Sequence, residues 1–89
     1  MKGQFREINE NVITYQVPIK EGSGVRTILG EIKKKNDGRY FWYRKNAKGI
    51  SANLFPNWIG QINGQPVQGV EDTIALAKQR ILEGWINEQ

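Results

Sequence analysis

The apolar residues of this chain follow two different spacings, and the change from one to the other restricts the fold. Residues 12–19 alternate, with Ile13, Tyr15, Val17 and Ile19 on one side, which is the period of a half-buried strand. From about Val70 to Ile86 the spacing becomes helical, with an apolar stripe formed by Ile74, Ala77, Ile81 and Trp85. Strands followed by a helix predict an α+β fold.

Further strands are expected at residues 25–35, 39–45 and 50–55. Asn36-Asp37-Gly38 lies between the first two and predicts a tight turn, because these residue types tolerate positive φ. Pro18 has no amide donor and favours an edge strand or a strand end. Asn63-Gly64 suits a small hairpin, whereas the glycines and the proline of residues 56–69 equally suit an irregular loop.

The expected architecture is a single domain over residues 1–89. It is an antiparallel sheet of three to four strands, with an extra small hairpin as an option, and one C-terminal helix packed on one face. Such a sheet cannot bury its apolar face alone, so the helix stripe is its partner and the other face stays in water. Glu71 and Asp72 are interpreted as the first turn of the helix, where negative charge is favourable.

The composition removes whole classes of chemistry. The chain has no cysteine and no histidine, which excludes disulfides, thiol nucleophiles, histidine-based triads and nearly every zinc or haem site. The nine carboxylates show no spacing that specifies a catalytic pair, so an enzyme, a cofactor and a metal are not expected. The sequence has no apolar run long enough to span a membrane. The absence of cysteine fits a reducing cytoplasm, which is the expected location.

Positive charge is concentrated in the middle of the chain. The net charge is +4, yet residues 26–48 hold eight basic and two acidic residues, whereas the remainder holds five basic and seven acidic ones. A basic cluster confined to one element is typical of proteins that bind polyanions. Lysines also protect exposed sheet edges from aggregation, which is the alternative interpretation.

Residues 39–45 carry aromatic and basic side chains in two alternating sets: Tyr40, Trp42 and Arg44, or Arg39, Phe41, Tyr43 and Lys45. The alternation does not decide which set faces the helix. Cations neutralise phosphates and exposed rings stack on unpaired bases, although such rings also serve as core and cross-strand packing. The candidate nucleic-acid contacts are basic residues of this region and two of its aromatics: Lys33, Lys34, Lys35, Arg39, Tyr40, Trp42, Arg44, Lys45 and Lys48.

The pieces GEIKKKNDGRYFWYRKNAKG and VEDTIALAKQRILEGW resemble the arm-type DNA-binding domains of tyrosine integrases. Those domains are in turn similar to the DNA-binding domains of plant ethylene-response factors. Small phage and mobile-element proteins share the same β-β-β-α pattern. The resemblance implies a three-stranded sheet that rests on a C-terminal helix and enters the DNA major groove. It further implies DNA contacts by Lys33, Lys35, Arg39, Arg44 and Lys45, and a helix core of Ile74, Ala77, Ile81 and Trp85.

The expected function is therefore a small binding module for nucleic acid, with double-stranded DNA favoured over single strands and no membrane contact. The alternative is a phage-type protein-interaction module that inhibits or regulates a host complex. Such a module would use the same basic face against an acidic protein surface, or an exposed sheet edge for strand addition.

Overall fold

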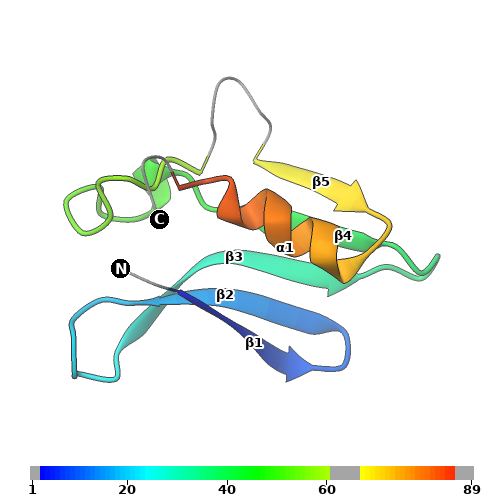
Figure 1. The fold of residues 1–89 in the computed structure, drawn as a ribbon, viewed down its shortest axis with the longest axis horizontal. Coiled ribbons are helices and arrows are strands. Elements are labelled where there is room, and N and C mark those ends of the chain that lie inside the picture. The colour runs from blue at the N-terminus through cyan, green and yellow to red at the C-terminus, as the bar shows by residue number, and fades with distance from the viewer. Residues whose placement is uncertain (1–2, 61–66, 86–89) are drawn as a thin grey trace.

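The fold is an antiparallel five-stranded sheet with one C-terminal helix, seen in a computed structural model that describes residues 3–60 and 67–85 (Figure 1). The strand order is β1-β2-β3-β4-β5, so each strand pairs with its neighbours in sequence. The elements are β1 (Gln4–Asn9), β2 (Val12–Pro18), β3 (Arg26–Lys34), β4 (Tyr40–Arg44), the one-turn 3₁₀ helix η1 (Ala47–Gly49), β5 (Gln68–Glu71) and α1 (Ile74–Leu82). The predicted α+β class is confirmed.

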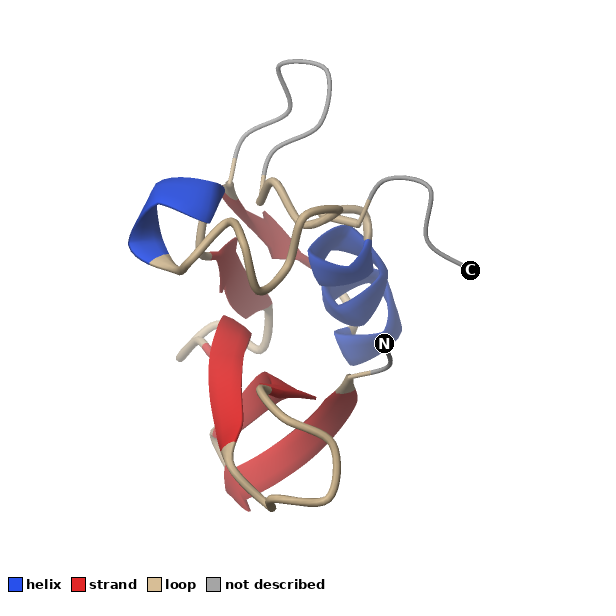
Figure 2. Ribbon diagram, turned by 90° about the vertical axis from the view of Figure 1, so that its left-hand side faces the viewer, coloured by secondary structure: helices blue, strands red, loops and turns tan. Residues whose placement is uncertain are grey.

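Helix α1 covers one face of the sheet, where it contacts β3, β4 and β5 (Figures 1 and 2). The side chains buried between the sheet, the helix and the segment after η1 are Tyr15, Val17, Leu29, Ile32, Trp42, Phe55, Trp58, Ala77 and Ile81. Of the predicted helix stripe, Ala77 and Ile81 are fully buried, and Trp85 packs against the core from just beyond the helix. Within the described residues no helix has the length and apolar character needed to cross a membrane.

The strands predicted at residues 12–19, 25–35 and 39–45 correspond to β2, β3 and β4. The turn between β3 and β4 also forms as expected, with Gly38 at φ 88° and the amide of Gly38 donating to the carbonyl of Lys35 at 3.1 Å. Pro18 is the last residue of β2, which is one of the two positions that its missing donor favours.

The fourth strand predicted at residues 50–55 is wrong. The chain there forms turns, with the amide of Leu54 donating to the carbonyl of Ser51 at 3.1 Å and the amide of Trp58 to that of Phe55 at 3.0 Å. The place beside β4 is taken by β5 rather than by residues 50–55. The hairpin predicted at Asn63-Gly64 lies outside the described residues.

The predicted start of the helix is also wrong. Glu71 ends β5, and α1 begins only at Ile74, after Thr73, whose hydroxyl accepts a hydrogen bond from the amide of Leu76 at 3.1 Å. Thr73 is therefore the N-cap, and neither Glu71 nor Asp72 lies in the first turn. Residues 68–71 pair with β4 instead of starting the helix, and they extend the sheet that α1 covers.

Candidate nucleic-acid interface

The register of the strands decides which side chains face the helix. Ile32, Trp42 and Gly69 lie opposite one another across β3, β4 and β5. Since Ile32 and Trp42 are buried in the core, this row faces α1. The neighbouring row of Lys33, Phe41 and Val70 therefore points to the opposite side.

We call this opposite side of the sheet, which α1 leaves uncovered, the outer face. By register it comprises Gln4, Arg6 and Asn9 of β1, Val12, Thr14, Gln16 and Pro18 of β2, Arg26, Ile28, Glu31 and Lys33 of β3, Phe41 and Tyr43 of β4, and Gln68 and Val70 of β5. The same alternation continues past the strand ends to Lys35, Arg39 and Lys45.

Two glycines explain why Trp42 and Arg44 face inward. Gly69 lies opposite Trp42 and Gly30 lies opposite Arg44. A Cβ at Gly69 would lie 3.0 Å from Cζ2 of Trp42, and a Cβ at Gly30 would lie 2.9 Å from Cγ2 of Ile81 in α1. The small residues on the neighbouring strands therefore leave the space that the large inward side chains and the helix occupy.

Trp42 and Arg44 cannot be nucleic-acid contacts in this structure, which corrects two of the predicted site residues. Each is 3% exposed. The indole Nε1 of Trp42 donates to Oε2 of Glu71 at 3.1 Å. The guanidinium of Arg44 donates to the carbonyls of Gly60 and Arg80 and lies 5.0 Å from the centre of the Trp42 ring. Burial lowers the pKa of Arg44, an effect that the nearby carboxylate of Glu83 opposes.

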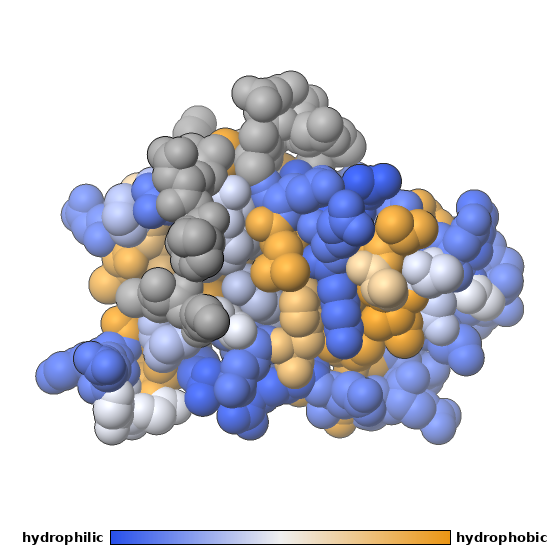
Figure 3. All heavy atoms as spheres, in the orientation of Figure 1, coloured by the Kyte–Doolittle hydropathy of each residue, from blue (hydrophilic) through white to orange (hydrophobic). Residues whose placement is uncertain are grey.

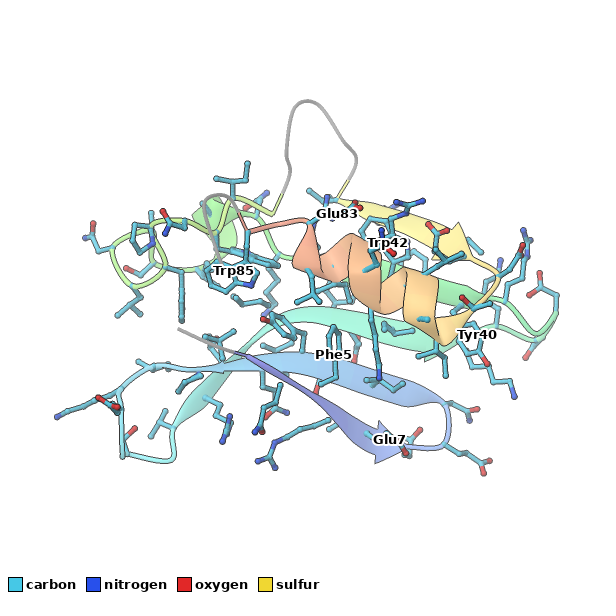
Figure 4. The ribbon with its side chains drawn as sticks, in the orientation of Figure 1. Phe5, Glu7, Tyr40, Trp42, Glu83 and Trp85 are labelled. Atoms are coloured by element: carbon cyan, nitrogen blue, oxygen red, sulfur yellow. The ribbon has the colours of Figure 1, made fainter. Side chains whose placement is uncertain are left out.

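The remaining predicted residues separate into two groups. Lys33, Lys35, Arg39 and Lys45 belong to the outer face. Lys34 and Tyr40 lie opposite each other on the side of α1, near the hairpin end, and Figure 4 shows Tyr40 and Trp42 on this helix side. The backbone of Lys48 lies in η1, and its side chain is outside the described part of the structure.

Phe41 and Tyr43 are the outer-face aromatics, and they were not among the predicted site residues. Both are half-buried, and their ring centres are 6.3 Å apart. From the alternation along β4 alone, the set with Phe41 and Tyr43 and the set with Trp42 and Arg44 are equally able to face the helix. The glycines opposite Trp42 and Arg44 on the neighbouring strands are what distinguishes the two sets.

Two carboxylates modify the charge of the outer face. Glu31 lies 3.7 Å from the ammonium of Lys33, and Asp37 accepts from the backbone amide and the guanidinium of Arg39 at 3.0 and 3.1 Å. The backbone hydrogen bond from Arg39 is the main cause that lowers the pKa of Asp37. Burial, followed by a hydrogen bond to Glu31, raises the pKa of Tyr43, so this phenol stays neutral at physiological pH.

The two sides of the sheet differ in charge. On the outer face and its ends the basic residues Arg6, Arg26, Lys33, Lys35, Arg39 and Lys45 outnumber Glu31 and the turn residue Asp37. On the helix side Arg80 is bound to Glu71 at 3.2 Å and to Glu83 at 3.3 Å. Figure 3 views the α1 side and shows polar and apolar side chains interleaved there. The excess positive charge therefore lies on the side away from α1.

The described residues contain no group of three or more acidic side chains that could hold a metal ion. Comparison of this chain with known protein families, with curated proteins and with solved structures found no match.

Proposed function

We propose that this protein is a non-enzymatic nucleic-acid-binding module and that the outer face is its binding surface. The observation that carries the proposal is the segregation of charge across the sheet. Lys33, Lys35, Arg39 and Lys45 flank Phe41 and Tyr43 on the uncovered face, while the acidic residues around α1 balance the cations there.

Cations on an exposed sheet bind nucleic acid because each one that meets a phosphate releases a condensed counterion. The described cations of the outer face are well placed for this, since the side chains of Lys33 and Arg39 are 56% and 52% exposed. Their pairing with Glu31 and Asp37 does not prevent binding, because ion pairs between exposed groups contribute only about 0–1 kcal/mol. A phosphate can therefore compete for both cations.

Double-stranded DNA is the ligand that the sequence favours, and only part of the sheet could enter its major groove. The part of the sheet narrow enough for a major groove is the end of the β3–β4 hairpin, where Lys35 and Arg39 flank the turn. A two-stranded β-ribbon fits a groove about 12 Å wide. Phage or mobile-element origin likewise stays a prediction from the resemblance.

The test compares two double variants with the same change in net charge. K33Q/K45Q removes two outer-face cations, and K20Q/K34Q removes two exposed cations elsewhere. Fluorescence anisotropy with labelled DNA at about 50 mM salt should show at least a tenfold loss of affinity for K33Q/K45Q and less than a threefold loss for K20Q/K34Q. Equal losses of affinity in the two double variants would mean that the outer face is not the specific binding surface. No binding by the wild type would overturn the proposal.

A protein-interaction module remains the second candidate because β1 is an edge strand that pairs, within the described residues, with β2 alone. A free strand edge accepts an added strand from a partner. A partner that stays bound in a pull-down after nuclease treatment, and that is lost when β1 carries a proline at Arg6, would favour this candidate over nucleic-acid binding.

A further inference from the structure

We infer that the outer face takes unpaired nucleotides, as single-stranded DNA or RNA, rather than a duplex. The inference rests on the proposed function and concerns the class of nucleic acid. It depends on three features of the outer face: its width, the spacing of its two aromatic rings, and the order of cations and rings along β4.

The width of the sheet prevents the whole outer face from entering a groove. All five strands belong to one sheet. Neighbouring strands lie about 4.8 Å apart, so five strands span about 19 Å, whereas the major groove is about 12 Å wide. A duplex could reach the hairpin end or lie flat on the face, and in both cases few outer-face residues would meet bases. A flexible single strand can follow the face instead.

The two aromatic rings have the spacing that unstacked bases require. The ring centres of Phe41 and Tyr43 are 6.3 Å apart, with 39° between the ring planes. Consecutive bases of a duplex are separated by about 3.4 Å along the axis, and their flat sides are covered by neighbouring bases. Each ring can therefore meet its own base only when the bases have separated. Stacking on such a ring is worth about 1–3 kcal/mol per base.

The order of side chains along β4 supplies the phosphate contacts at both ends of this pair. Arg39, Phe41, Tyr43 and Lys45 follow one another at every second residue on the outer face. Two residues of a strand cover about 6.8 Å, so the row is about 20 Å long. Lys33 lies directly opposite Phe41 on β3 and adds a third cation beside the rings. A single strand lying along this row would place bases on the rings and phosphates near the cations.

The experiment measures the affinity of the full chain for labelled oligo(dT), oligo(U) and a mixed-sequence duplex of about 20 nucleotides each, at about 50 mM salt. The test variant is F41L/Y43L, which keeps apolar side chains on β4. The matched control is Y40L, an aromatic-to-leucine change on the same strand but on the α1 side. Thermal unfolding by circular dichroism establishes that each variant is folded.

The inference predicts that the wild type binds the single strands more tightly than the duplex. F41L/Y43L should lose at least tenfold in single-strand affinity, with less than a twofold change for the duplex and little effect of Y40L. In NMR spectra, ring protons of Phe41 should shift upfield when oligo(dT) is added.

Two results separate this inference from the proposed function. Duplex binding at least as tight as single-strand binding, with no effect of F41L/Y43L, would overturn the single-strand inference and leave nucleic-acid binding by the outer face intact. Absence of binding to all three oligonucleotides would overturn both. If F41L/Y43L is unfolded, the NMR shifts of the wild-type protein decide between the outcomes.

Discussion

At the scale of single residues, Gly30 and Gly69 determine which chemistry the outer face presents. They lie beside Arg44 and Trp42 on the inner face, where they leave room for these side chains and for Ile81 of α1. As a consequence Phe41 and Tyr43 face outward. Alternation along β4 could not predict this choice, because both sets contain aromatics and cations and the deciding residues lie on other strands.

Gly30→Ala should destabilise the fold without altering the binding surface. The added Cβ would lie 2.9 Å from both Cγ2 of Ile81 and the backbone carbonyl of Tyr43. Overpacking of this kind costs about 1–3 kcal/mol. Urea unfolding should show that loss for G30A and a smaller one for G49A, where a Cβ meets only Oδ1 of Asn46 at 3.8 Å. Equal stability of G30A and the wild type would contradict the close contact of α1 with β3.

Glu31→Gln should strengthen nucleic-acid binding. The change removes the one carboxylate among the strand residues of the outer face and releases Lys33 from its ion pair. A charge removed beside the ligand has a larger effect than one removed farther away, because salt screens beyond about 8–10 Å. Titration of labelled oligonucleotide, followed by fluorescence anisotropy, should show about a threefold gain in affinity for E31Q. The control E83Q, with the same charge change beside α1, where Glu83 pairs with Arg80 at 3.3 Å, should gain less affinity. A larger gain for E83Q would contradict the assignment of the outer face.

At the scale of elements, the sequence predicts the strands and the helix whose apolar residues recur with the spacing of a strand or of a helix and pack in the core. β2, β3, β4 and α1 each do so and were found. β1 has only Phe5 as a partly buried apolar residue, and β5 has only four residues, so neither has an apolar pattern of its own. These two strands form because β2 and β4 offer free edges. Residues 50–55 form turns instead, and β5 lies in the place beside β4.

The turn between β3 and β4 should respond to acid. Its carboxylate, Asp37, has a folded-state pKa below its ordinary value, mainly because the amide of Arg39 donates to it. A lowered pKa stabilises the fold above the unfolded-state pKa of about 3.9, and that contribution is lost as the pH falls through the folded value. The free energies of unfolding of the wild type and of D37N, measured with urea from neutral pH downward, should converge below pH 4. A constant difference across that range would show that the carboxylate charge plays no part.

At the scale of the whole molecule, the net charge of +4 results from an uneven distribution over the two sides of one sheet. The sequence located the excess in residues 26–48 but could not assign it to a side. Of the nine predicted contacts, four lie on the outer face, two lie at the hairpin end on the helix side and two are buried. The ninth, Lys48, has its backbone in η1 and its side chain outside the described part of the structure. The buried pair shows why composition overestimates a binding site: Trp42 and Arg44 have their hydrogen-bonding groups satisfied within the core.

Binding should depend on salt in proportion to the outer-face cations that meet phosphates. The logarithm of affinity falls linearly with the logarithm of salt concentration, with a slope of about 0.7 per phosphate contact for single strands. K33Q/K45Q should therefore reduce the magnitude of the slope by about 1.4, and K20Q/K34Q should leave it unchanged. Identical slopes for the two double variants would mean that Lys33 and Lys45 meet no phosphates.

The segregated charge of the sheet can be tested most directly by NMR. In a titration of the isotope-labelled protein with oligo(dT), the backbone amides of Lys33, Phe41, Tyr43 and Lys45 should move, while those of Ala75, Leu76 and Gln79 on the solvent side of α1 stay in place. Movement confined to α1, or no movement at any concentration in low salt, would contradict the assignment of the outer face as the binding surface.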